Sequence, residues 1–196
     1  MARIVAVRTL GARRGNPNYQ RYSVMDATPA TDWEIDEVFA RLDPESAREV
    51  ELAGSDIAQA HQMFSCLASI RQADTIRHEG EVLAVFGWSI IDGAIETGFL
   101  AKERFFRPDI PSVRFLGRHF RALQDRSGGI PLISHSYSRR ATAPRWFDLI
   151  GYDLVATDGP CRTYRLPERS AARQRQRFRH PASGPEGGGR EDVGKR

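Results

Sequence analysis

The chain has 196 residues, a net charge of +4 at pH 7 and a hydrophobic share of 40%, which is typical of one globular domain. Its apolar runs fall short of the roughly 20 residues of a membrane helix, and the N-terminal run is too short for a secretory signal, so we expect a protein that is not secreted. Two cysteines and five histidines, all scattered, exclude a disulfide framework and give no zinc spacing, so no metal site is expected.

Positive charge is concentrated at the two ends of the chain. Residues 1–21 carry a net charge of +5 and residues 167–196 carry +4, which leaves residues 22–166 at −5. We therefore expect a basic N-terminal arm at 1–21, a folded domain at 22–166, and a basic tail at 167–196, rich in Arg, Gly and Pro, that is disordered in isolation. Such arms can bind DNA or an acidic protein surface, or they can serve only to keep the protein in solution.

Apolar periodicity predicts the elements of the first half of the domain. They are a strand at 22–27, helices that begin near 32, 44 and 56, and strands at 75–78, 82–91 and 94–100. Asp43 and Pro44 suit the N-cap and first position of the second helix, which Gly54 ends. Asp92 and Gly93 form a tight hairpin turn.

The second half of the domain alternates helices and strands. The predicted elements are a helix from 109 to 126, a strand at 130–137, a helix at 140–150, and strands at 152–157 and 161–166. The helix at 109–126 connects two strands as a crossover, so these strands should be parallel, whereas the hairpins are antiparallel. The sequence therefore predicts an α+β fold with a mixed, mostly antiparallel sheet flanked by helices.

One segment of the second half carries a family resemblance. Residues 140–152 combine a small residue, Ala143, with Ile150, Gly151 and Tyr152 at the end of a helix. This pattern resembles the second motif of the GNAT superfamily of N-acetyltransferases, in which a glycine ends the helix before the chain reverses into a strand. The resemblance implies a GNAT-like fold over 22–166 and, in active members, acetyl-coenzyme A as acyl donor.

The segment that would hold the coenzyme departs from the family pattern. Active members share a loop written [QR]-x-x-G-x-[GA], whose backbone N–H groups hold the pyrophosphate. The corresponding segment here begins at Arg107, and Ile110 and Ser112 stand where the glycines would be. Pro108 and Pro111 have no N–H to donate.

The helix motif departs from the family pattern as well. Phe147 stands where active members commonly have a tyrosine that acts as general acid, and Arg140 stands where they often have asparagine. With the loop, these departures predict a non-catalytic protein that binds no cofactor.

Three further segments, 42–54, 79–87 and 145–151, resemble GNAT-like virion proteins of tailed bacteriophages. This resemblance implies a structural or binding role in a virion, or in the host cytoplasm before assembly. The implied partners are other virion proteins and, through the basic arms, DNA.

The alternative is an active N-acyltransferase that uses acetyl-coenzyme A through a variant loop. In this hypothesis Arg107 and Ser112 contact the coenzyme, and Glu96 or His135 is the general base. Glu96 can equally be a solvated charge on a strand face with no catalytic role. The choice between Glu96 and His135 as general base therefore stays open. A third hypothesis, an inhibitor of a host enzyme, rests on small size alone.

Overall fold

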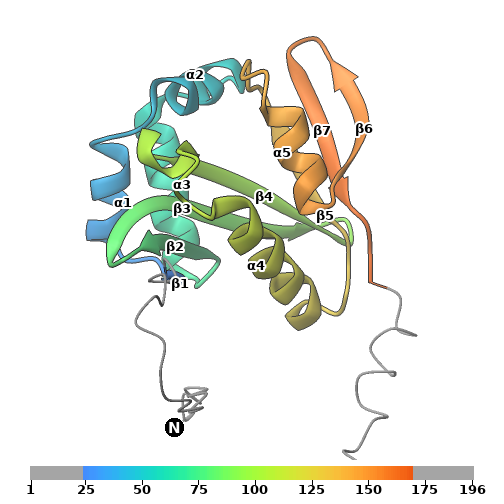
Figure 1. Ribbon diagram of the computed structural model, residues 1–196, viewed down its shortest axis with the longest axis horizontal. Helices are drawn as coiled ribbons and strands as arrows, with labels where there is room; N and C mark the ends of the chain where they lie inside the picture. Colours follow the sequence, from blue (N-terminus) through green and yellow to red (C-terminus); the bar gives the residue numbers. More distant parts are fainter. Residues whose placement is uncertain (1–23, 170–196) are drawn as a thin grey trace, which may run out of the picture.

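A seven-stranded mixed sheet in the order β1-β2-β3-β4-β5-β7-β6 is the centre of the fold (Figure 1). This computed structural model describes residues 24–169, so the predicted arm at 1–21 and nearly all of the predicted tail lie outside the described residues. The strands are β1 (Met25–Pro29), β2 (Ala73–His78), β3 (Glu81–Ile91), β4 (Ala94–Ala101), β5 (Leu132–Ser136), β6 (Asp153–Asp158) and β7 (Cys161–Leu166).

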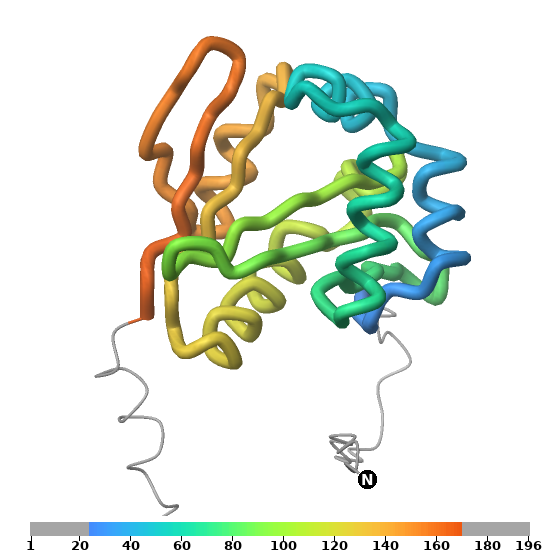
Figure 2. Tube along the Cα trace, turned by 180° about the vertical axis from the view of Figure 1, so that it is seen from behind, coloured from blue at the N-terminus to red at the C-terminus, as the bar shows by residue number. Residues whose placement is uncertain are grey.

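Helices cover both faces of this sheet. They are α1 (Asp32–Phe39), α2 (Pro44–Leu52), α3 (Ile57–Ser69), the 3-10 helix η1 (Glu103–Phe106), α4 (Ser112–Arg126) and α5 (Ala143–Ile150). Figure 1 shows α4 in front of the sheet, and the reverse view in Figure 2 shows α1 and α3 in front of it. Each face has its own core: Ile35, Val38 and Phe64 on the α1/α3 face, and Leu116 and Phe120 on the α4 face.

The predicted fold class and element order are confirmed. All neighbouring strands are antiparallel except β4 and β5, which are parallel and are connected through α4. Asp43 caps α2 by accepting a hydrogen bond from Ser46 N–H at 3.0 Å. Gly151 ends α5 with a φ of +100°, a left-handed conformation that glycine adopts without a Cβ penalty.

Helix α4 begins at Ser112 rather than at residue 109, and the 3-10 helix η1 precedes it at residues 103–106. The reason is the pair Pro108 and Pro111, because the residue before a proline is disfavoured in helical conformation. Arg107 accordingly has an extended backbone, and Pro111 is the N-cap of α4.

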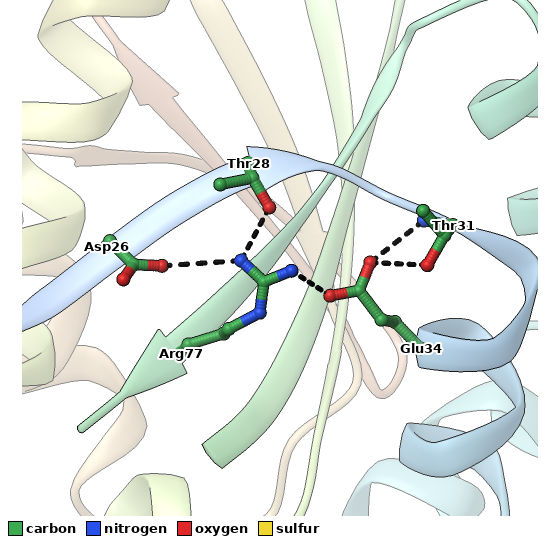
Figure 3. A network of polar contacts seen from close by, with 5 residues as sticks. All are labelled: Asp26, Thr28, Thr31, Glu34 and Arg77. Carbon is green, nitrogen blue, oxygen red and sulfur yellow. Dashed lines mark hydrogen bonds and ion pairs between the residues drawn. The ribbon is translucent and has the colours of Figure 1, made fainter. Parts of the chain in front are cut away.

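The β1 edge of the sheet is tied to α1 by a polar network around Arg77 (Figure 3). The Arg77 guanidinium donates to Thr28 Oγ1 at 2.6 Å and forms an ion pair with the fully buried Glu34. Glu34 also accepts from the N–H and hydroxyl of Thr31, which closes the capping box of α1. The network satisfies the buried carboxylate, so we assign it a structural role.

Within residues 24–169 no helix combines the length and apolar character needed to cross a membrane.

Candidate functional site

Strands β4 and β5 separate after a short parallel stretch. Only three residue pairs join them, the last of which is Thr97 with Ser134. At this point Thr97 Oγ1 lies 2.5 Å from Ser134 Oγ and donates to the Ile133 carbonyl at 3.0 Å. Residues 98–101 of β4 then pair with β3 alone. Figure 2 shows the two strands side by side at their beginnings and spreading apart toward α2.

A first cavity opens on the α4/α5 face at this divergence, and we call it the α5-side cavity. Its volume is about 110 Å³, which suits a slender chain rather than a bulky group. Aromatic side chains of β3, β4, η1, α4 and α5 line it together with polar side chains, among them those of Thr97, Ser134, Ser136 and Arg140.

A second cavity of about 420 Å³, the α3-side cavity, opens on the opposite face of the same divergence. Helices α2 and α3 and residues 98–100 of β4 form its wall. Glu49, Phe99 and His135 line both cavities. The two cavities therefore adjoin where the strands part, and two reactants entering from opposite faces would meet there.

Glu49 reaches this meeting point from α2. Its Oε2 accepts hydrogen bonds from Ser136 Oγ at 3.2 Å and from Tyr137 N–H at 3.1 Å. Burial raises the pKa of the Glu49 carboxyl above its ordinary value; its hydrogen bonds with Ser136, Tyr137 and Ser138 lower the pKa, and nearby Glu45 adds to the rise. A carboxyl with a raised pKa at the junction of two cavities has the properties of a general base.

The same helix holds the segment that leads from β5 to α5. Glu45 accepts from Arg139 N–H at 2.6 Å, and Asp43 pairs with the Arg140 guanidinium at 2.5 Å. The Arg140 guanidinium also lies 4.4 Å from the centre of the Phe106 ring. These contacts fix the divergence of the strands from the side of α2. Because the Arg140 guanidinium already pairs with Asp43 and packs on Phe106, we assign Arg140 a structural role.

The hydroxyl groups at the divergence include a buried tyrosine. Burial raises the pKa of Tyr152, and the hydroxyls of Ser134 and Thr97 act in the opposite direction. Tyr152 therefore stays neutral. Phe147, the residue at the family's tyrosine position, lines the α5-side cavity and stacks on Tyr164 with ring centres 3.9 Å apart.

The N-terminus of α4 offers backbone donors for an anion. The first helical hydrogen bond runs from Phe115 N–H to the Pro111 carbonyl, so the N–H groups of Val113 and Arg114 have no partner inside the helix. The exposed side chains of Arg107 and Arg114 stand near this end, and the helix dipole adds positive potential. Phosphate groups fit such a helix end, although the preceding prolines supply fewer N–H donors than a glycine loop.

The structure distributes the site residues proposed from the sequence over different places. His135 lines both cavities, and its Nδ1 lies 3.1 Å from Thr163 Oγ1. Glu96 is half-buried on β4 and lines neither cavity. Arg107 is exposed and Ser112 is buried at the start of α4, and both lie outside the cavity walls.

Sequence reasoning missed Glu49. Its partners Ser136 and Tyr137 are 87 and 88 residues away in the chain, so no local pattern marks it among the other acids of its helix.

Comparisons with solved structures agree with the topology. The chain is similar to PaiA N-acetyltransferase from Thermoplasma acidophilum in complex with coenzyme A, with 11% identity, a TM-score of 0.56, and coverage of 74% of this chain and 99% of that chain. It is similar to an acetyltransferase of the GNAT family from Bacillus anthracis, with 9% identity, a TM-score of 0.55, and coverage of 73% and 94%. It is also similar to aminoglycoside acetyltransferase AAC(6')-Ib in complex with coenzyme A, with 11% identity, a TM-score of 0.57, and coverage of 79% and 99%.

Sequence comparisons add no relative: no family model and no curated protein matches the chain. The neighbours named above are acetyltransferases, and none of their names refers to a virion.

The expectation of no cofactor is wrong in the light of these structures, because two proteins that share the fold hold coenzyme A. The expectation gave too much weight to the loop at 107–112. The prolines there remove backbone N–H donors, and Ile110 and Ser112 add side chains where the family has glycines, but the divergence of β4 and β5 and the end of α4 remain in place. In the part of the chain that the structure describes, the architecture is that of GNAT acetyltransferases.

Proposed function

We propose that the protein is an N-acyltransferase that uses acetyl-coenzyme A or a related acyl-coenzyme A as donor. One observation carries the proposal: two cavities on opposite faces of the sheet adjoin at the divergence of β4 and β5, and Glu49, with its raised pKa, lines both. A donor in one cavity and an amine in the other would meet beside this carboxylate.

The residues on each side suit these two roles. The α5-side cavity is narrow and rich in aromatic side chains, and residues 98–100 of β4 have no strand on the β5 side to take their hydrogen bonds, whereas the Ala101 carbonyl accepts from Asp43 N–H at 2.9 Å. An extended chain with amide groups, such as the pantetheine arm, can bind along such an edge. The N-terminus of α4, with Arg107 and Arg114, would take the phosphates.

The donor supplies an acyl group activated as a thioester. Transfer forms a C–N bond to the acyl carbon and breaks its C–S bond. Glu49 would take the proton that the amine must lose, because its side chain lies where the two cavities adjoin. Phe147 has no proton for the departing sulfur, so the sulfur would leave as a thiolate and take up a proton from solvent, which balances the proton that Glu49 would accept and later release.

A second candidate is a protein that keeps the ligand-binding cleft but transfers nothing. Phe147 in place of a tyrosine and the glycine-free loop at 107–112 favour it. The virion role expected from the sequence belongs to this candidate.

The test is release of free thiol from acetyl-coenzyme A in the presence of a panel of primary amines. We expect the Glu49→Gln variant to lower kcat/KM by about 100-fold or more, because general-base catalysis contributes this much. Glutamine keeps an acceptor for Tyr137 N–H, so the fold should persist. Glu51→Gln, on the same helix but exposed, is the matched control and should keep full activity.

Equal activity of the Glu49→Gln and Glu51→Gln variants would remove Glu49 from the mechanism. Tight binding of coenzyme A without thiol release for any amine would favour the second candidate instead.

A further inference from the structure

The α3-side cavity has charged side chains at one end and a largely uncharged wall elsewhere. Its wall includes the uncharged polar side chains of Ser55, Gln59 and Tyr137, but its larger part is apolar and includes Val50, Ala60, Met63, Phe64 and Leu100. Its volume of about 420 Å³ lies in the range of cavities that hold small molecules. A ligand that fills it would therefore bury an apolar group against these side chains.

Charge is confined to the inner end of this cavity. Of the described residues that line it, only Glu49 and His135 have side chains that can carry charge near neutral pH, and both lie where the cavity meets its neighbour. An ammonium group would be attracted to the Glu49 carboxylate at this end. A second positive charge farther along the ligand would find no second carboxylate among the described residues that line the cavity, which is unfavourable for a partly desolvated ammonium.

At the apolar end of the α3-side cavity, Gly98 has no side chain to fill the space beside Phe64 and Met63. A Cβ atom on Gly98 would lie 3.5 Å from Phe64 Cζ and 4.0 Å from Met63 Cε, so the missing side chain leaves room above the ring. Met63 itself is 49% exposed and forms the rim on α3. A charge placed at Met63 would thus face the outer end of a ligand whose amine is at Glu49.

We infer that the acceptor is a primary amine that carries a single positive charge and an apolar substituent of several carbons, bound in the α3-side cavity with its amine at Glu49. The inference rests on the proposed function, whose acceptor it specifies. It excludes polyamines as preferred acceptors, since their second ammonium would have no second carboxylate among the described lining residues to pair with.

The test compares two amines of equal length, n-hexylamine and 1,5-diaminopentane. With acetyl-coenzyme A as donor, we expect kcat/KM to be about tenfold or more higher for n-hexylamine, because the diamine must desolvate its second ammonium. Met63→Glu adds a carboxylate at the rim and should reduce this preference by about threefold to fivefold, the effect of an exposed ion pair. Gln62→Glu adds the same charge one residue away, outside the cavity wall, and should leave the preference unchanged.

Calorimetric titration of each amine into the full-length protein gives a readout that needs no turnover. Equal or reversed preference in transfer and in binding would overturn the inference. If n-hexylamine binds more tightly but neither amine is acylated, the proposed transfer fails while the ligand class stands. Because Met63 is exposed, its variant should fold normally, so a lost preference reports on the cavity.

Discussion

At the scale of single residues, Glu49 is the side chain on which the proposed chemistry depends. It lies on α2, accepts hydrogen bonds from the segment after β5, and lines both cavities. Burial of its carboxyl has a consequence for stability as well as for catalysis. The pKa is raised in the folded protein, so the folded state holds a proton more firmly than the unfolded chain does.

We therefore expect Glu49 to lower the free energy of unfolding as pH rises from its ordinary pKa of 4.5 through the raised value in the folded state. Below 4.5 both states are protonated and the effect vanishes. The Glu49→Gln variant lacks this dependence, so its stability relative to the natural chain should increase with pH across this window. Urea denaturation between pH 4 and pH 8 measures the difference, and parallel curves for the two proteins would contradict the expectation.

At the scale of elements, α4 and α5 flank the cleft, and a glycine within α4 and a glycine directly after α5 have different roles. Gly151 ends α5 with a φ of +100°, and the α4 helix passes close to the end of α5 at Gly117. A Cβ on Gly117 would lie 3.9 Å from the Ile150 carbonyl oxygen, which is an ordinary contact. Only at Gly151 does the backbone conformation require a glycine.

Gly151→Ala should lower the free energy of unfolding by about 1–2 kcal/mol, because an L-residue in left-handed conformation is strained. Gly117→Ala should leave it unchanged or raise it by up to about 1 kcal/mol, since alanine favours the helix interior. Urea denaturation of both variants provides the comparison. A similar loss in both would mean that close packing of α4 on α5, rather than the left-handed turn, governs these positions.

At the scale of the whole molecule, a ligand that spans β4, β5 and the end of α4 would bind only the folded chain. Coenzyme A at 100 times its Kd should add about 2.7 kcal/mol to the free energy of unfolding. For a domain of this size, this corresponds to a rise in Tm of roughly 5–10 °C. A thermal-shift titration measures it, with free adenosine as control; no shift at millimolar coenzyme A would contradict the proposed donor.

Much of the fold could be predicted from the sequence because its signals are local. The apolar periods, the Asp43 cap and the Gly151 stop each act within a few residues, and the structure confirms them. Element boundaries next to prolines were less accurate, as the start of α4 at Ser112 shows. The resemblance of residues 140–152 to the GNAT motif likewise depended on a short segment, and the fold agrees with it.

The sequence by itself thus determined the order of the elements, the α+β class and the places where strands turn. The tertiary structure alone decided where β4 and β5 part, which side chains face the two cavities, and that Glu49 rather than Glu96 lies between them. The physical reason is the distance along the chain between the residues that interact. Caps and turns arise from neighbouring residues, whereas Glu49 is held at the cleft by contacts between α2 and a segment 87 residues farther along the chain, which no local pattern encodes.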